Sequence, residues 1–470
     1  MVVQKIIPGA GPADLAALLS DEREVFVVCD KAVCKNGTFC APTGTGGPAV
    51  DKNTPFLYTD GQNGLGRVQN DPVFVHGADG VPELEPGGLS SGALGPEPGL
   101  QTREALGPEL GLPVDEALRR VLGERLKGWY VLEASEGAKD IGTVMEIERA
   151  MMEAGVSRGG LVLSVGGGIT TDIGGFAASI YKRGIRFANV PTTLLAMVDA
   201  AIGGKTGVNL DGYKNMVGVI RQPEFVYIDP AFLQTLPERE VRCGLAEMLK
   251  TFLLSDAGLF EEAVAALPEI PARLILEAGR IKEAIVAEDP FESGRRTILN
   301  LGHTFAHAIE RCSREPATED AAAGQGPFAP ATEGAASGQG PVAPATEDAA
   351  AGQGPVAPDG SSPLAEPASQ GPCRRPIPHG EAVAMGIVLA CRLSDRLGVS
   401  EKDCSLEAYV RGAFRKAGLP VDCPYSISDL SGAMSKDKKA SGENVRFVLL
   451  EAPGRPVLRD LPVSEVAAAL

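Results

Sequence analysis

Histidine and glutamate residues with metal-ligand spacing stand out in a chain that has only four histidines. His303 and His307 are four residues apart, which places them on one face of a predicted helix, and His379 begins another. Glu247 and Lys250 fall on adjacent turns of a third predicted helix. Two or three histidines with a carboxylate form the ligand set of a catalytic divalent metal site. The spacing leaves open which histidines would bind the metal, because an i, i+4 pair could supply both ligands.

A glycine-rich turn follows the predicted buried strand 161–165. Three glycines, 166–168, lead into a helix, so the backbone can approach a ligand closely and free N–H groups can face a pyrophosphate. The first and third glycines fit the dinucleotide-binding fingerprint, whereas Thr171 stands at its last glycine position. The turn alone is a weak signal. The alternative is a tight turn in which Asp172 serves the helix geometry.

The stretch from 181 to 215 is dense in polar and charged residues set among glycines and short apolar runs. Asp and Lys residues that line a cleft are seldom purely structural. This stretch therefore predicts a ligand site. Its candidate residues are Arg183, Thr192, Thr193, Asp199, Lys205, Lys214 and Asn215.

The elements around these residues change character near Asp229-Pro230. Strand-like runs at 24–29, 128–132 and 161–165, with a helical pattern over 141–155, indicate a parallel α/β sheet in residues 1–230. Residues 231–470 are predicted to be α-helical. Helical spacing recurs there at 238–254, 258–266, 271–288, 298–311, 379–397 and 404–416.

The chain holds 58 Gly and 36 Pro residues, and much of this excess is predicted to lie in two inserts. One covers about 36–126 in the first domain. The other, 313–376, contains a 14-residue repeat that begins at Pro316. Such segments bury too little apolar surface to offset their ordering entropy. We expect a flexible insert at 313–376, with a small solenoid as the alternative.

The formal net charge of −17 argues against nucleic acid and anionic membranes as partners. An anionic ligand must therefore meet a local basic cluster. No apolar run reaches the roughly 18 residues of a membrane span, and the first residues lack a secretory signal pattern. The nine cysteines include no CxxC pair, so we expect a cytoplasmic chain with reduced cysteines.

The motifs and their order resemble the 3-dehydroquinate synthase family from about Gly128 to Leu450, with the insert between. In the first half the resemblance is carried by GGGITTDIGGFAASIYKRG at 166–184, VPTTLLAMVDAAIGGKTG at 190–207 and KNMVG at 214–218. In the second half it is carried by GLAEMLK at 244–250, EDPFESGRRTILNLGHTFAHAIE at 288–310 and HGEAVAMG at 379–386. It implies an α/β N-terminal Rossmann-like NAD-binding domain plus an all-α C-terminal domain that holds Zn²⁺ or Co²⁺. The active site would lie in the cleft between them.

The resemblance also implies roles for individual residues. The metal ligands would be Glu247, His303 and His379, which leaves His307 for acid–base and phosphate-side work. The NAD contacts would be Asp30, Glu136, Lys139, Gly167, Gly168, Ile169, Thr170, Thr171, Asp172, Thr192, Thr193, Lys205, Lys214, Phe232, Leu233, Gln234 and Thr235. The substrate and catalytic residues would be Arg183, Asp199, Lys205, Asn215, Lys250, Lys282, Glu292, Arg296, Asn300, His307 and Lys438.

The family's substrate is 3-deoxy-D-arabino-heptulosonate 7-phosphate, a sugar acid with a carboxylate and a phosphate. Seven basic positions would converge on it: Arg183, Lys205, Lys214, Lys250, Lys282, Arg296 and Lys438. The implied reaction is a closed redox cycle. NAD⁺ takes hydride from C5, phosphate is eliminated, the hydride returns, and an intramolecular aldol step gives 3-dehydroquinate. NAD⁺ is thus a recovered cofactor.

One departure from the family concerns the nucleotide. The usual Asp-x-Asn after the first strand is Asp30-Lys31-Ala32 here, so the ribose-binding carboxylate is present and the Asn contact is missing. The alternatives are another sugar phosphate cyclase, a metal-dependent polyol dehydrogenase, or a non-catalytic scaffold. The basic set argues against a dehydrogenase, and the intact metal ligands argue against a scaffold. The resemblance also suggests a homodimer.

Overall fold

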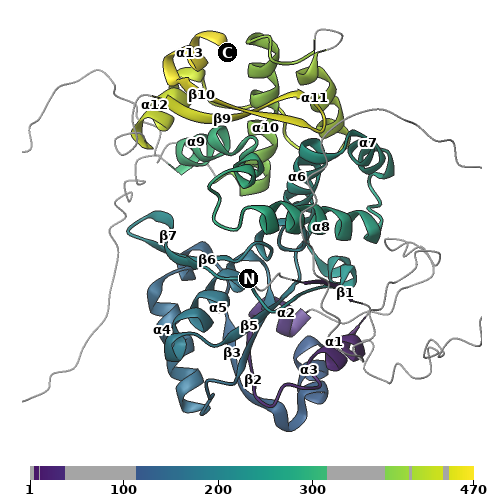
Figure 1. The fold of residues 1–470 in the computed structure, drawn as a ribbon, viewed down its shortest axis with the longest axis vertical. Helices are drawn as coiled ribbons and strands as arrows, with labels where there is room; N and C mark the ends of the chain where they lie inside the picture. Colours follow the sequence, from purple (N-terminus) through teal and green to yellow (C-terminus); the bar gives the residue numbers. More distant parts are fainter. Residues whose placement is uncertain (1–4, 10, 37–112, 315–375, 402–404, 438–443) are drawn as a thin grey trace, which may run out of the picture. The chain divides into compact units, whose positions relative to one another are not determined.

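The structure, a computed structural model, describes residues 5–9, 11–36, 113–314, 376–401, 405–437 and 444–470 (Figure 1). These residues fall almost entirely in one compact unit, Met1–Cys312 with Ile377–Leu470. The other unit is Ser313–Pro376, which has the bounds of the second predicted insert. Most of that insert, most of the first one, and Lys438 lie outside the described residues.

A six-stranded parallel sheet forms the centre of the first half. Its order is β1 (Ile6–Pro8), β8 (Val226–Ile228), β5 (Arg186–Pro191), β4 (Leu161–Gly166), β2 (Val25–Asp30) and β3 (Leu126–Leu132). The strands predicted at 24–29, 128–132 and 161–165 are its central and edge strands β2, β3 and β4. Both faces are covered, which is why the central strands are continuous apolar runs.

The two faces of the sheet carry different helices (Figure 1). Side chains alternate along β2, so Phe26 and Val28 pack with α4 (Ile141–Glu153) and α5 (Gly168–Ile180). Val25 and Val27 face the other way, into the core that includes α1 (Pro12–Leu18) and α3 (Val114–Leu122). This arrangement confirms the predicted α/β class.

The strand order reverses between β2 and β4. From β2 the chain continues outward to β3, whereas β4, β5 and β8 follow one another in the opposite direction. In open α/β sheets, ligands bind outside the carboxyl ends of the strands at such a switch point. Asp30 ends β2 and Gly166 ends β4, so the predicted nucleotide residues lie at this point.

Helix α3 corrects the predicted extent of the first insert. The Gly/Pro-rich segment was expected to run to about residue 126, yet Val114, Ala117, Leu118 and Leu122 are buried on one face of α3. Their spacing of three and four residues is that of an amphipathic helix. The residues from 113 onward therefore belong to the folded core.

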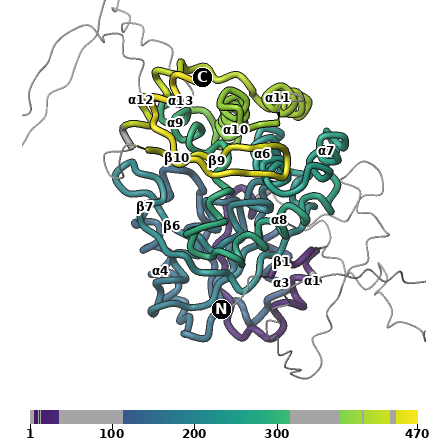
Figure 2. The backbone as a smooth tube through the Cα atoms, turned by 45° about the horizontal axis from the view of Figure 1, so that its top comes forward, coloured from purple at the N-terminus to yellow at the C-terminus, as the bar shows by residue number. Residues whose placement is uncertain are grey.

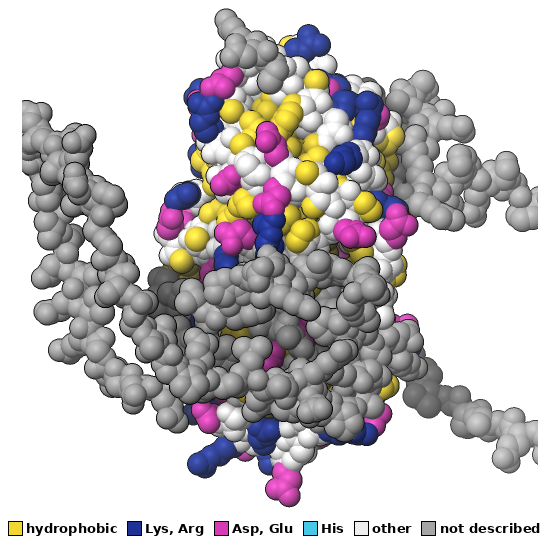
Figure 3. Space-filling view, turned by 90° about the vertical axis from the view of Figure 1, so that its right-hand side faces the viewer, with side chains coloured by type: hydrophobic (Ala, Val, Ile, Leu, Met, Phe, Trp, Pro, Cys, Tyr) yellow, Lys and Arg dark blue, Asp and Glu magenta, His cyan; other side chains and the backbone are white. Residues whose placement is uncertain are grey.

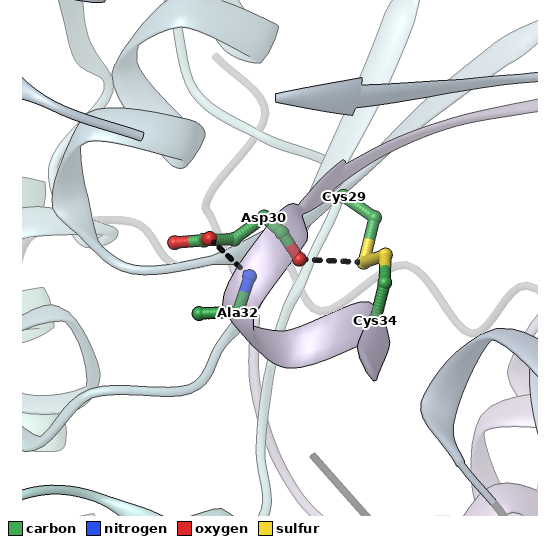
Figure 4. The surroundings of a disulfide bond; sticks show 4 residues. All are labelled: Cys29, Asp30, Ala32 and Cys34. Atoms are coloured by element: carbon green, nitrogen blue, oxygen red, sulfur yellow. Dashed lines mark hydrogen bonds between the residues drawn. A yellow bond between two sulfur atoms is a disulfide. The ribbon is translucent and has the colours of Figure 1, made fainter. Parts of the chain in front are cut away.

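The expectation of reduced cysteines fails at one pair. Cys29, in β2, and Cys34, on α2 (Lys31–Asn36), form a disulfide, shown in Figure 4. The first turn of α2 carries the chain back over the end of β2 and brings the two Cα atoms within 6.5 Å. Asp30 lies between them, and its Oδ1 accepts a hydrogen bond of 2.9 Å from the Ala32 N–H.

The second half is helical, as predicted. Its helices are α6 (Glu238–Ser255), α7 (Ala257–Ala266), α8 (Ala272–Glu288), α9 (His303–Arg314), α10 (His379–Arg396), α11 (Leu406–Lys416), α12 (Ile427–Asp437) and α13 (Val463–Ala469). It also contains an antiparallel hairpin that sequence analysis missed, β9 (Asn444–Ala452) with β10 (Arg455–Pro462). A turn through Gly454, at φ 83°, joins the two strands, and β9 packs on α10.

The two halves meet through several elements, including α8, which packs against β1 (Figure 2). The predicted boundary near Asp229-Pro230 is where β8 gives way to the short helix η5 (Pro230–Thr235). On the face in Figure 3, basic and acidic side chains are interspersed with apolar ones. Among the described residues, no helix has the length and apolar character needed to cross a membrane.

Candidate active site

Three metal-ligating side chains from three helices converge in the structure. Glu247 lies on α6, His303 is the first residue of α9, and His379 is the first residue of α10. One ligand atom from each lies within 4.8 Å of the other two. The Nε2 atoms of His303 and His379 are 3.6 Å and 3.3 Å from Glu247 Oε1. This is the group that the resemblance implied.

Two glycines on α10 permit this convergence. A Cβ on Gly380 would collide with the backbone of Cys243, one turn before Glu247 on α6. A Cβ on Gly386 would collide with the carbonyl of Gly302, which immediately precedes His303. Only glycine lets helix backbones come this close. The first turns of α9 and α10 are thus held directly over Glu247.

The chemistry of these donors fits a divalent cation. Glu247 is fully buried, and neither of its side-chain oxygens makes a hydrogen bond of normal geometry. Nζ of Lys250 lies 2.5 Å from Glu247 Oε2, and the two histidine rings approach Glu247 Oε1. Buried carboxylate oxygens need a partner, and two imidazole nitrogens beside a carboxylate form a known ligand set for zinc and related metals. Glu247, His303 and His379 therefore fit a bound divalent metal ion.

The protonation states also suit a metal site. Burial lowers the pKa of His303 to about 3, and Lys250 adds to the shift, so its imidazole is neutral. Burial opposes a charge on His379 as well, but its contacts with Glu247 and Glu310 raise its pKa to about 9. Glu247 keeps a pKa well below its usual value because Lys250 and the two histidines outweigh its burial. A metal would displace the His379 proton on binding.

His307 lies outside this group of ligands. It is exposed on α9, and its ring meets that of His303 edge-on with centroids 5.8 Å apart. The alternative in which His303 and His307 form an i, i+4 metal pair is therefore not the arrangement of the structure. The exposure of His307 suits the acid–base role that the resemblance implied.

Glu310 is a site residue to which sequence reasoning gave no role. It is buried on α9, and its Oε1 lies 2.8 Å from Nδ1 of His379. Its Oε2 accepts a hydrogen bond of 3.0 Å from Nζ of Lys214. These two cations outweigh burial and lower the pKa of Glu310 to about 2. The available signal was its spacing of seven residues from His303, which keeps both on one helix face.

Asp199 joins two predicted lysines beside the metal group. It lies in the helical turn η4 (Ala196–Ala200), and its Oδ1 accepts a hydrogen bond of 2.6 Å from Lys282 on α8. Nζ of Lys250 is 3.9 Å from the same oxygen. Against burial, these lysines lower the pKa of Asp199. The carboxylate thereby fixes two buried ammonium groups in one place.

A second cluster involves η6 (Arg295–Asn300) and the loop before it. Glu292 pairs with Lys205 and accepts a 2.8 Å hydrogen bond from Asn300. Arg296 is buried, and one of its guanidinium nitrogens donates to the carbonyl of Gly203 at 2.9 Å. The structure thus brings these four predicted residues to the boundary between the two halves.

The predicted nucleotide turn sits at the carboxyl ends of β4 and β5. Helix α5 begins at Gly168, so Ile169 and Thr170 lie in its first turn, where N–H groups lack intrahelical partners. The Thr171 N–H already donates to the Gly167 carbonyl. A Cβ on Gly168 would lie 2.9 Å from the Ala200 Cβ. The adjoining residues are Gly167, Thr192 and Thr193: a Cβ on Gly167 would touch Thr193, and the Thr192 N–H donates to the Gly166 carbonyl.

Lys139 anchors a polar network on the same side of the sheet. It donates 2.5 Å and 2.6 Å hydrogen bonds to Asp172 and Asn215. Burial raises the pKa of Asp172 to about 6 despite the ion pair. Asn209, which sequence analysis missed, accepts from the Asn215 N–H and donates to Glu136. Glu136 and Lys139, both predicted NAD contacts, thus each bind other side chains of this network.

Asn209, Lys214 and Asn215 all belong to a hairpin that the polar pattern of the sequence concealed. It consists of β6 (Lys205–Leu210) and β7 (Tyr213–Ile220), joined through an Asp-Gly turn at positive φ. The remaining predicted residues lie on two short helical turns. Phe232, Leu233, Gln234 and Thr235 form η5 after β8, and Arg183 is exposed at φ 70° on η3 (Tyr181–Arg183).

The fold and the donor set define a class, which comparison with solved structures identifies as the sugar phosphate cyclases. A 2-epi-5-epi-valiolone synthase of Streptomyces hygroscopicus, solved with NAD⁺ and Zn²⁺, is 27% identical at a TM-score of 0.56, covering 75% of this chain and 85% of that one. A 2-deoxy-scyllo-inosose synthase with carbaglucose-6-phosphate, NAD⁺ and Co²⁺ shares the fold at 18% identity and a TM-score of 0.59, covering 98% and 95%.

Sequence comparisons then narrow the class to one family. Family models for the 3-dehydroquinate synthase N-terminal and C-terminal regions match residues 129–243 and residues 244–322 with 371–440. A 3-dehydroquinate synthase of Acidithiobacillus ferrooxidans is 36% identical over 349 residues, covering 72% of this chain and 79% of that protein. One of Acinetobacter baumannii is 36% identical over 350 residues, covering 72% and 80%. The chain belongs to the 3-dehydroquinate synthase family.

Proposed function

We propose that this chain converts 3-deoxy-D-arabino-heptulosonate 7-phosphate to 3-dehydroquinate and phosphate, a carbon–oxygen lyase reaction of the shikimate pathway. The observation that carries the proposal is the convergence of Glu247, His303 and His379 beside a set of buried lysines. A metal centre next to ammonium groups suits a substrate with both hydroxyl and anionic groups.

NAD is assigned to the switch point and a Zn²⁺ or Co²⁺ ion to the three-helix centre. The turn at 166–168, the Asp30 carboxylate and the first turn of α5 would hold the dinucleotide. Glu247, His303 and His379 would hold the metal. When bound, NAD⁺ supplies a hydride acceptor and the metal supplies charge stabilisation for the substrate oxygens.

The basic residues of this site are already paired with carboxylates. Lys205 contacts Glu292, Lys214 contacts Glu310, and Lys282 contacts Asp199. These pairs keep long cationic side chains ordered in positions where the carboxylate and phosphate of a sugar acid could bind. An incoming anion would share or replace the protein carboxylates, so recognition needs little new ordering of the lysines.

Polar side chains at the edge of the site would stabilise charge on the substrate and transfer protons. Asn300 donates its amide to Glu292, which leaves the other N–H of that amide for a substrate oxygen. His307 is exposed beside His303, where it can exchange protons with both substrate and solvent. Arg296 is held by the carbonyls of Pro290 and Gly203 and presents its remaining N–H groups from a fixed position.

The deciding experiment measures inorganic phosphate released from the heptulosonate phosphate by the purified chain with NAD⁺, before and after treatment with a chelator. We expect stoichiometric phosphate and 3-dehydroquinate, with activity lost on metal removal and restored by Co²⁺ or Zn²⁺. No phosphate release, or release that is insensitive to metal removal, would overturn the assignment.

A second cyclase substrate is the strongest competing function, because the valiolone synthase shares this fold at 27% identity. Preferential turnover of a phosphorylated sugar that lacks the carboxylate would favour this other cyclase function. Accumulation of NADH would indicate a polyol dehydrogenase, and no turnover of any sugar phosphate would indicate a scaffold. A cytoplasmic location and a homodimer stay predictions, which fractionation and sedimentation can test.

A further inference from the structure

One buried carboxylate serves two elements from different halves of the chain. Glu310, on α9, is 5% exposed. Its Oε1 is 2.8 Å from Nδ1 of His379 on α10, and its Oε2 is 3.0 Å from Nζ of Lys214 on β7. His379 and Lys214 are 165 positions apart in the sequence. The Glu310 carboxylate contacts both of them.

The contact with Glu310 determines how the His379 ring is presented. With Nδ1 directed at the carboxylate, the other ring nitrogen, Nε2, faces Glu247 at 3.3 Å. An imidazole whose Nδ1–H is donated to a carboxylate keeps its Nε2 lone pair for a metal, and such outer partners also fix the ring orientation.

We propose that Glu310 is a positioning residue for the metal centre, which holds His379 in its ligating tautomer and ties Lys214 of the β6–β7 hairpin to the same carboxylate. This inference rests on the proposed metal site. The inference adds that Glu310 contacts both the β6–β7 hairpin and the metal ligand His379. Displacing Lys214 therefore changes the environment of the metal ligand.

The need for a carboxylate follows from counting acceptors. Glu310 offers one oxygen to each of two donors. A glutamine replaces one of these two oxygens by an N–H₂ group, and the charged Lys214 should attract the remaining oxygen more strongly than a neutral His379 does. The glutamine N–H₂ would then face Nδ1 of His379 and favour the tautomer with a proton on Nε2, which cannot bind a metal.

Metal affinity of the full chain tests this directly, with Co²⁺ as the probe in competition with a chelator. We expect Glu310→Gln to weaken Co²⁺ binding by about 10- to 100-fold, as is usual for outer-shell partners. The double variant Glu310→Gln with Lys214→Met should regain most of the affinity, because the glutamine oxygen is then available to His379. A purely structural role for Glu310 would not predict rescue by a second substitution.

The matched control is Glu381→Gln. Glu381 lies on α10, two residues from His379, but its carboxylate binds Arg239 at 2.8 Å. The Glu381→Gln substitution removes the same charge close to the same histidine. We expect this variant to bind Co²⁺ with wild-type affinity. Equal loss in both variants would mean that charge, not positioning, explains the effect, and would overturn the inference.

A spectroscopic readout separates the two histidines. In the Co²⁺-loaded chain, each ligating imidazole should give one exchangeable, strongly shifted N–H proton signal. The Nδ1 of His303 lies 3.3 Å from the Leu301 carbonyl, so its signal should persist in Glu310→Gln while that of His379 shifts or disappears. A wild-type chain that binds no Co²⁺ would overturn this inference and the proposed metal site together. Wild-type binding with unchanged affinity and spectrum in Glu310→Gln would overturn the inference alone.

Discussion

His303 and His307 lie one turn apart on α9, but they have different surroundings in the structure. His303 Nε2 faces the buried Glu247 carboxylate, whereas His307 is exposed. His303→Asn should therefore lose more metal affinity than the roughly 10- to 100-fold typical of an outer-shell change. His307→Asn should keep the metal but lower turnover by about 10²- to 10⁴-fold, the usual contribution of an acid–base group. Metal content and phosphate release, measured on both variants, distinguish the roles. Loss of metal from His307→Asn would contradict the assignment.

Asp229 is a buried carboxyl whose titration should be visible in stability. It caps η5 by accepting from the Ala231 N–H, its Oδ2 has no hydrogen-bond partner, and burial raises its pKa to about 7. Its usual value is 3.8, so the folded chain takes up this proton first as the pH falls. Asp229 therefore destabilises the fold increasingly as the pH rises from about 4 to about 7, and by a constant amount above that.

The corresponding variant is Asp229→Asn, which keeps the cap and removes the charge. In urea unfolding at pH 8 we expect it to be more stable than the wild type by up to about 4 kcal/mol, a difference that shrinks toward zero near pH 4. Asp256→Asn is the control, because Asp256 also caps a helix, α7, but is exposed. The same pH-dependent gain in both variants would contradict an explanation based on burial.

Helix contacts that sequence periodicity does not report decide the metal geometry. The ranges predicted for α6, α8 and α10 agree with the structure within a residue or two, because apolar spacing depends only on local burial. The crossing of these helices depends on Gly380 and Gly386, whose role emerges only when two distant backbones meet. Likewise, hairpin β6–β7 was hidden because β7 is largely exposed and its apolar residues do not alternate with polar ones as they do in a half-buried strand. The sequence predicted which kinds of side chain would bind the metal. It did not predict that Glu310 would contact one of them.

Gly386 offers a direct test of this element-scale argument. A Cβ there would collide with the Gly302 carbonyl, so Gly386→Ala should destabilise the chain by about 1–3 kcal/mol, as overpacking usually does, and weaken Co²⁺ binding by moving His303. Gly412 lies on α11 with nothing within 4 Å of an added Cβ. Gly412→Ala should instead stabilise by about 0.5–1 kcal/mol, the ordinary helix preference for alanine. Urea unfolding of both variants checks the signs. A stabilising Gly386→Ala would refute the close contact of α9 and α10.

Across the whole molecule, the site is held by contacts that join residues far apart in the chain. Lys282 on α8 binds Asp199, Arg296 binds the Gly203 carbonyl, and Glu310 binds Lys214. In each case one partner comes from the sheet half and the other from the helical half. The catalytic geometry therefore depends on the packing of these halves against each other. We expect it not to depend on the length of the segment that connects α9 and α10.

The connection between α9 and α10 tests this conclusion. His303 and His379 are 76 residues apart in the sequence, yet both contact Glu247. Closing such a loop costs only about 1.4 kcal/mol more than closing one of about 15 residues, because the cost grows with the logarithm of length. The packing of Gly386 on Gly302 already sets the distance between the two helices.

Replacing residues 316–372 with a short linker should therefore leave metal binding and phosphate release at the wild-type level, with stability unchanged or raised by about 1 kcal/mol. A chain that carries a scrambled 316–372 segment of equal length is the matched control, because it changes sequence and keeps loop length. Equal activity in all three chains would mean that the segment acts neither through its length nor through its sequence. A folded deletion variant that cannot bind Co²⁺ would show that the segment helps to place His379, since this histidine begins α10 directly after the connection.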